Sequence, residues 1–113
     1  MHTVHLEEQG SPSGFMAAAL GIMFSVNDYT ANLNDEEIMI IDQFFDSFQW
    51  HETTRNHVAE FVPYADLVNL VDFHNRWVYQ GSVTTPPCAQ KVFWNQISTV
   101  YPVKQRHVDA FKR

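Results

Sequence analysis

The sequence of 113 residues predicts one globular unit that combines β-strands with α-helices. Three observations lead to this α+β class. Val92 and Trp94 alternate on one face of the stretch 91–96, as in a half-buried strand. Residues 15–26 form a nearly continuous apolar run, which is typical of a strand covered on both faces. The clearest helical spacing is confined to residues 34–48.

The composition limits the class of protein and its partners. Hydrophobic residues make up 45% of the chain and aromatic residues 14%, which is too apolar for a disordered protein and enough for one modest core. The net charge of −6, without a basic patch, argues against a nucleic-acid partner. No run approaches the roughly 18 apolar residues of a membrane span, and the N-terminus lacks the layout of a signal peptide.

The first residues, Met1–Leu6, are predicted to form a strand. Successive side chains of a strand point to opposite faces, so His2 and Val4 share one face and His5 lies on the other. We therefore do not expect His2 and His5 to bind one metal ion together.

A loop and an apolar segment follow. Glu7–Gly14 is rich in glycine, serine and proline, which predicts a surface loop. Phe15–Val26 contains Gly21 and favours a strand over an amphipathic helix. Ala17–Ala19 are strong helix formers, so a helix competes on propensity alone.

A helix is predicted to start at Asn34, because Asn34 and Glu37 have the spacing of a capping box. Apolar residues follow at helical spacing, namely Ile38, Ile41, Phe44, Phe45 and Phe48. We interpret this stripe as core packing. The other face carries Asp35, Glu36, Asp42, Gln43 and Asp46, which we interpret as solvated surface.

The stretch Gln49–Asn75 predicts a connection with short extended pieces, because Pro63 interrupts helical continuity. His51, His57 and His74 are scattered through or near it, and no two of them have the close spacing of zinc ligands. Surface or hydrogen-bonding roles are therefore favoured for these histidines.

The C-terminal part predicts two strands and a short helix. The strands are Asn75–Tyr79 and Lys91–Gln96, and Pro102 ends the extended chain that follows the second one. The helix is predicted over Lys104–Arg113. Its inward-facing residues are expected to be Val108 and Phe111.

The stretch Tyr79–Cys88, of sequence YQGSVTTPPC, combines more backbone constraints and hydroxyl groups than any other. Gly81 permits a positive φ, and the two prolines fix φ and withhold two N–H donors. A bond that precedes proline is also where cis peptides occur. The result is a stiff loop that presents hydroxyls from Ser82, Thr84 and Thr85.

This loop resembles the active-site loop of the α-class carbonic anhydrases, whose usual form is Tyr-x-Gly-Ser-Leu-Thr-Thr-Pro-Pro-Cys followed by a Val-x-Trp strand. Here Val92-Phe93-Trp94 stands in the place of that strand. Met1–His5 resembles the family's Leu-His-x-Val-His strand, and Leu20-Gly21-Ile22 its Leu-Gly-Ile. The resemblance implies that residues 1–113 form a partial domain that is mainly β with peripheral helices, the C-terminal part of a large, twisted, mostly antiparallel sheet. It also favours a strand over a helix for Phe15–Val26.

The resemblance also implies a function, the zinc-dependent reversible hydration of carbon dioxide to bicarbonate. His2 matches a zinc ligand, Thr84 the threonine that orients the reacting oxygen, and Thr85 a contact of bicarbonate. The apolar residues that match or are suited to the substrate pocket are Val4, Ala19, Val83, Val92 and Trp94. Those that match structural support of the loop are Tyr79, Pro86 and Pro87.

Several parts of the family site have no counterpart here, since the His-x-His pair that supplies two zinc ligands would precede Met1. One ligand cannot hold zinc, so these residues alone are expected to be inactive. Sulfonamide or anion inhibitors are expected to bind only if the site is complete. The alternative is a catalytically inactive carbonic anhydrase-related subunit for binding or assembly. Cys88 after Thr-Thr-Pro-Pro slightly favours a secreted or extracytoplasmic protein by the same resemblance.

Overall fold

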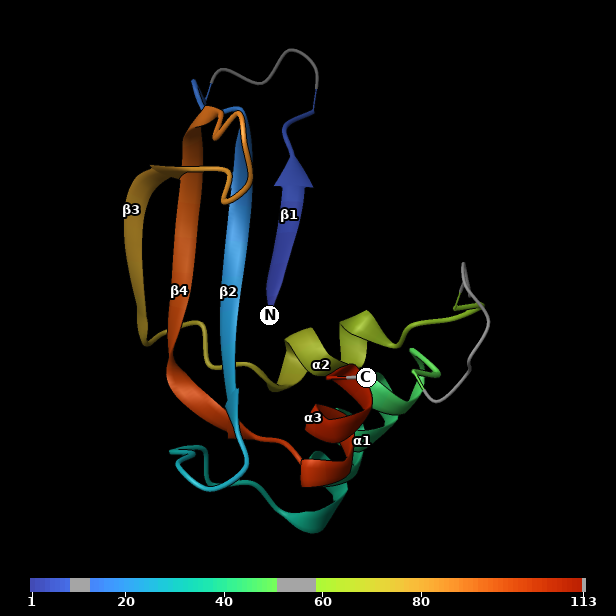
Figure 1. Cartoon of the computed structure of the whole chain (residues 1–113). Helices are drawn as coiled ribbons and strands as arrows, with labels where there is room; N and C mark the ends of the chain where they lie inside the picture. Colours follow the sequence, from blue (N-terminus) through green and yellow to red (C-terminus); the bar gives the residue numbers. More distant parts are fainter. Residues whose placement is uncertain (9–12, 51–58, 113) are drawn as a thin grey trace. The chain divides into compact units, whose positions relative to one another are not determined.

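The computed structural model describes residues 1–8, 13–50 and 59–112, so His51 and His57 lie outside the described residues. In chain order the elements are β1 (His2–Leu6), β2 (Ala17–Ser25), α1 (Asp35–Asp46), α2 (Tyr64–Leu70), β3 (Arg76–Ser82), β4 (Gln90–Pro102) and α3 (Gln105–Phe111) (Figure 1). The prediction of a mainly β fold with peripheral helices is confirmed. None of the helices in the described ranges has the length and apolar character needed to cross a bilayer.

The chain divides into two compact units. The first unit contains Met1–Met23 and Asp72–Thr99, and the second contains Phe24–Val71 and Val100–Arg113. The division falls inside β2 and β4. The candidate site residues named above all belong to the first unit.

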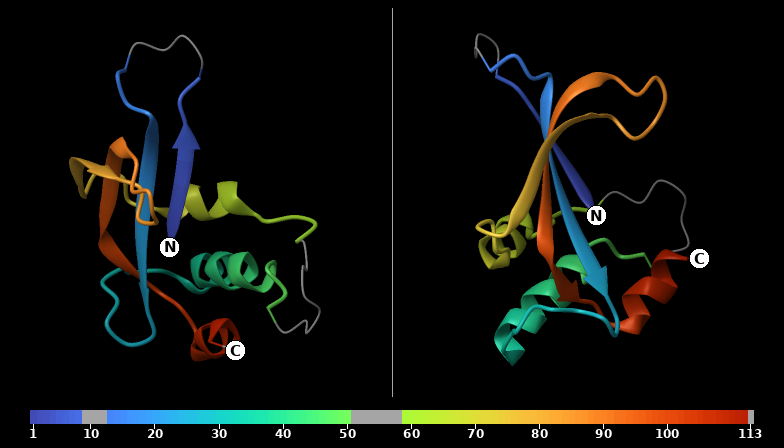
Figure 2. Two further views of the ribbon diagram at one scale, coloured as in Figure 1. Left: turned by 45° about the horizontal axis from the view of Figure 1, so that its top comes forward. Right: turned by 90° about the vertical axis from the view of Figure 1, so that its left-hand side faces the viewer.

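The four strands form one mixed sheet in the order β1-β2-β4-β3. The outer pairs, β1 with β2 and β3 with β4, are antiparallel. The central strands β2 and β4 run in the same direction (Figure 2). All four predicted strands are present, and the apolar segment is a strand rather than a helix. Two strands are longer than predicted, because β3 continues to Ser82 and β4 continues to Pro102.

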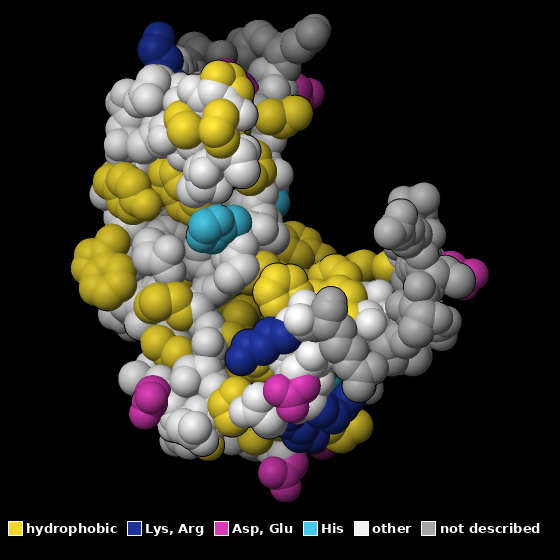
Figure 3. All heavy atoms as spheres, viewed as in Figure 1, with side chains coloured by type: hydrophobic (Ala, Val, Ile, Leu, Met, Phe, Trp, Pro, Cys, Tyr) yellow, Lys and Arg dark blue, Asp and Glu magenta, His cyan; other side chains and the backbone are white. Residues whose placement is uncertain are grey.

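Strand β3 forms one edge of the sheet among the described strands. Three successive large side chains of this strand, Trp77, Val78 and Tyr79, are exposed. Successive residues of a strand face opposite sides, so both faces of β3 are open. Hydrophobic side chains accordingly gather at this edge of the sheet in the space-filling view (Figure 3).

In the second unit, α1 begins with the predicted capping box. The Asn34 side chain accepts a hydrogen bond from the Glu37 amide, and the Glu37 side chain accepts one from the Asn34 amide. Ile41 and Phe44 are buried, as the helical spacing predicted. The prediction that Asp42 lies on a solvated face was wrong, because Asp42 is buried.

Two further predictions for the second unit were wrong. Residues 64–70 form α2 instead of a connection: Pro63 occupies the N-cap position, where the ring does not interrupt the hydrogen bonds of a helix. The C-terminal helix is present as α3, but Phe111 is 72% exposed and Val108 is only half-buried. The buried residue of α3 is His107.

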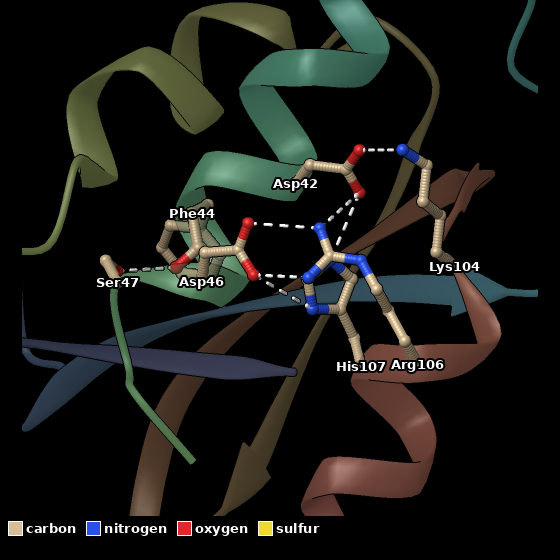
Figure 4. A network of polar contacts seen from close by, with 7 residues as sticks. All are labelled: Asp42, Phe44, Asp46, Ser47, Lys104, Arg106 and His107. Atoms are coloured by element: carbon tan, nitrogen blue, oxygen red, sulfur yellow. Dashed lines mark hydrogen bonds and ion pairs between the residues drawn. The ribbon is translucent and has the colours of Figure 1, made fainter. Parts of the chain in front are cut away.

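Buried Asp42 is explained by a polar network between α1 and the segment that contains α3 (Figure 4). Asp42 Oδ1 lies 3.1 Å from His107 Nε2, and Asp42 Oδ2 pairs with the Lys104 ammonium. Arg106 donates two hydrogen bonds to the Asp46 carboxylate, at 2.6 and 3.0 Å. These hydrogen bonds from Arg106 lower the pKa of Asp46 below its ordinary value.

We expect the Asp46–Arg106 pair to stabilise the second unit at neutral pH but not in strong acid. A carboxyl with a lowered folded-state pKa contributes stability above its unfolded pKa of about 4, and that contribution is lost as the pH falls through the folded-state value. Asp46→Asn should therefore lower the urea midpoint at pH 7, and this loss should become smaller as the pH is lowered toward 2. Asp28→Asn removes an exposed carboxylate outside the network and is the control. Equal losses for Asp46→Asn at both pH values would contradict this account.

Candidate functional site

Strand register places most of the predicted site residues on one face of the sheet in the first unit. His2 is opposite Gly21 and Val4 is opposite Ala19 in the β1–β2 pair. In the β3–β4 pair, Tyr79 is opposite Trp94. Residues directly opposite each other project to the same side of a sheet, so each register pair brings two side chains together.

An apolar cluster forms on this face. Ala19, Val92 and Trp94 are buried together, and Val83 is partly buried against them. Val4 does not join the cluster, since 62% of its surface is exposed. The structure therefore brings together four of the five residues that were predicted to line an apolar pocket.

Trp94 is the residue of this cluster that makes most of the directional contacts. Its ring meets the His2 ring edge-to-face, with centroids 4.9 Å apart and an interplanar angle of 76°. The Tyr79 ring lies on another side, nearly parallel, with centroids 6.2 Å apart. The indole Nε1–H donates a hydrogen bond of 3.0 Å to the Ser82 carbonyl. One buried side chain thus contacts β1, β3 and the start of the hydroxyl-bearing loop.

The loop after β3 is closed by two backbone hydrogen bonds. The Val83 amide donates to the Ala89 carbonyl at 2.9 Å, and the Cys88 amide donates to the Thr85 carbonyl at 2.9 Å. The bond between Pro86 and Pro87 is cis. Thr84 and Thr85 are both exposed on this closed loop.

The reason for glycine at position 81 differs from the one predicted. Positive φ angles in this region occur at Cys88 and Lys91 and not at Gly81. A Cβ at position 81 would lie 2.7 Å from Trp94 Cδ1 and 3.1 Å from Tyr79 Cε2. Glycine is therefore required here because the strand backbone lies directly against the Trp94 ring.

The described residues do not by themselves fit a zinc site. Among residues 1–8, 13–50 and 59–112, no three His, Cys, Asp or Glu side chains come together in a group that could hold a metal ion. His5 Nε2 lies 3.3 Å from Thr3 Oγ1, on the face opposite His2. A catalytic zinc needs three protein ligands, and His2 is one candidate.

The sequence reasoning missed Gln96, which lies two residues after Trp94 on the same face of β4. Its amide Nε2–H donates to the Gly21 carbonyl at 3.3 Å. A Cβ at Gly21 would collide with the Gln96 side-chain oxygen. The sequence does contain a signal for this contact. Residues two apart on a strand share a face, so Gln96 is expected beside Trp94 and its apolar cluster.

Comparisons with known proteins agree with this fold. The sequence model of the eukaryotic-type carbonic anhydrase family matches residues 1–113. The α-carbonic anhydrase from Thermovibrio ammonificans in complex with the inhibitor sulfanilamide is 21% identical, with a TM-score of 0.63 over 98% of this chain and 42% of that chain. The α-carbonic anhydrase from Photobacterium profundum is 21% identical, with a TM-score of 0.60 over 98% of this chain and 44% of that one.

A third similar structure is dioscorin complexed with ascorbate, which is 22% identical, with a TM-score of 0.61 over 96% of this chain and 40% of that chain. A search of curated proteins found no match. At these identities the structures establish a shared fold. The chain spans less than half the length of each of these three structures.

We expect Gly81→Ala to destabilise the first unit by about 1–3 kcal/mol, the usual cost of inserting a methyl group into a packed site. The new methyl group would push against Trp94, so near-ultraviolet circular dichroism should also change. Urea unfolding followed by circular dichroism measures both effects. Gln80→Ala changes the neighbouring, exposed residue of β3 and should have little effect. A neutral result for Gly81→Ala would show that the close approach is not a constraint.

Proposed function

Because the chain belongs to the eukaryotic-type carbonic anhydrase family, whose members are zinc enzymes, we propose that the complete domain hydrates carbon dioxide reversibly to bicarbonate. In this proposal the 113 residues are one part of that domain. The observation that supports it is the position of Trp94, which contacts His2 and also holds the Ser82 carbonyl, two residues before Thr84. The histidine and the hydroxyl loop therefore have a common neighbour.

Each group of residues has a role that fits its environment. We assign to the exposed Thr84 and Thr85 hydroxyls the hydrogen bonds that orient the reacting oxygen and bicarbonate. Carbon dioxide is small and has no net dipole, so it suits an apolar surface better than a polar one. In this proposal it lies against Val83, the partly buried residue that packs on Ala19, Val92 and Trp94, and the Trp94 ring also contacts the His2 ring.

We further propose that the 113 residues alone do not bind zinc tightly and do not hydrate carbon dioxide at an enzymatic rate. His2 supplies one of the three protein ligands that catalytic zinc requires. The other two would come from outside the described residues. Sulfonamides would then bind only where those ligands are present.

One observation favours a second candidate function, a catalytically inactive subunit for binding or assembly. The described part of the chain contains the packed sheet and loop without a group of three metal ligands. A binding subunit needs the scaffold and does not need the metal. Such a subunit would remain in a larger assembly without zinc.

Purified 113-residue protein should contain much less than one zinc ion per chain after dialysis against zinc. In a stopped-flow assay, the rate of carbon dioxide hydration should not exceed that of the uncatalysed reaction in buffer alone. Atomic absorption and the stopped-flow assay, with and without a sulfonamide, measure the two properties. Stoichiometric zinc with sulfonamide-sensitive hydration would overturn the proposal that further ligands are needed.

In a longer polypeptide that contains these residues and binds zinc, Thr84→Ala should lower kcat by roughly a hundredfold or more, the typical effect of removing one transition-state hydrogen bond. Zinc content should not change, because Thr84 is exposed and is not assigned as a ligand. Thr84→Ser keeps the hydroxyl and should retain most of the activity. Unchanged turnover in Thr84→Ala would refute the role given to this residue.

A further inference from the structure

We propose that Trp94 is the positioning residue of the candidate site. Its indole N–H fixes the Ser82 carbonyl and its ring fixes the orientation of the His2 imidazole, so one side chain sets the relation between the histidine and the hydroxyl loop. The catalytic consequence rests on the proposed function, whereas the positioning itself does not.

The contact with Ser82 lies where the loop leaves the sheet. Gly81 pairs with Val92, but Ser82 pairs with Gln90, so the ladder is irregular between Gly81 and Ser82. At such an irregularity the regular backbone pairing is interrupted, so a side chain can take the place of a ladder partner. The indole Nε1–H donates to the Ser82 carbonyl at this point, next to the backbone hydrogen bond from Val83 to Ala89, and Thr84 follows two residues later.

The contact with His2 requires Trp94 to reach across a strand. Strand β2 lies between β4 and β1 in the sheet. On this face β2 carries Ala19 and Gly21, and Gly21 is the register partner of His2. The short Ala19 side chain packs under Trp94, and the Trp94 ring meets the His2 ring directly, with centroids 4.9 Å apart.

The Trp94 ring is confined, which allows it to act as a fixed reference. It is 6% exposed and packs on Ala19 and Val92. Tyr79 lies nearly parallel to it, and the backbone of Gly81 is close enough that even a methyl group would collide with it. The indole is therefore held in the orientation in which its N–H reaches the Ser82 carbonyl. In this orientation its ring also makes the edge-to-face contact with His2.

The first test needs no substitution. In hydrogen exchange followed by NMR, the Trp94 indole N–H should exchange roughly tenfold or more slowly than the Trp77 indole N–H, because a buried, hydrogen-bonded group must open before it exchanges. Trp77 is 60% exposed on β3 and is the internal reference. Equal exchange rates would show that the Ser82 hydrogen bond does not hold and would overturn the proposal.

The second test separates the N–H from the ring. Trp94→Phe keeps an aromatic ring and removes the donor, whereas Trp77→Phe is the matched control on the exposed surface. In the 113-residue protein, only Trp94→Phe should shift the amide resonances of Val83 and Thr84 and the ring resonances of His2. Unchanged resonances in a folded Trp94→Phe protein would overturn the proposal. If that variant does not fold, the hydrogen-exchange measurement on the unsubstituted protein tests the proposal instead.

The catalytic consequence is tested in a longer, zinc-binding polypeptide that contains this sequence. Trp94→Phe should lower kcat about tenfold with zinc content unchanged, and Trp77→Phe should not. Equal kcat for Trp94→Phe and the unsubstituted protein would show that the positioning has no role in turnover. If the unsubstituted polypeptide has no hydration activity, the proposed function fails, while the NMR measurements still decide the positioning of the loop and His2.

Discussion

The hydrogen bond from the Trp94 indole to the Ser82 carbonyl is the contact on which the site in the first unit depends. A buried indole N–H without a partner costs about 1–3 kcal/mol, so the ring is stable only where a carbonyl meets it. That requirement brings the end of β3 against the ring, which in turn excludes any side chain at Gly81. The loop that carries Thr84 therefore starts from a position fixed by a side chain of the neighbouring strand.

The second unit is organised by a different constraint, the burial of a carboxylate. Asp42 is buried, and His107 and Lys104 supply it with partners. Removing one partner of a buried charge is costly, about 3–5 kcal/mol, because the remaining charge is left without compensation. This explains why α3 buries His107 while leaving Phe111 exposed: the orientation of the helix follows from the carboxylate rather than from its largest apolar residue.

The sequence predicted those features that depend on neighbouring residues. The capping box of Asn34 and Glu37 is local, and so are the apolar run that indicated β2 and the helical spacing that indicated α1. It did not predict that Asp42 is buried, because its partners lie more than 60 residues away in the chain. The sequence also did not predict why position 81 is glycine, because Trp94 lies on another strand. A glycine indicates a special backbone position, but it does not tell whether a positive φ or a neighbouring ring requires it.

Packing accounts for some site residues and not for others, which bears directly on the two candidate functions. Trp94 and Gly81 are required by the scaffold, so an enzyme and an inactive binding subunit would both need them. Thr84 and Thr85 are exposed on a loop that backbone hydrogen bonds and the Pro86–Pro87 pair already close. Among the described residues, no side-chain hydrogen bond of either threonine hydroxyl contributes to the closure of this loop. Both hydroxyls are therefore free to meet a reacting or bound group, which the catalytic proposal requires and the scaffold alone does not.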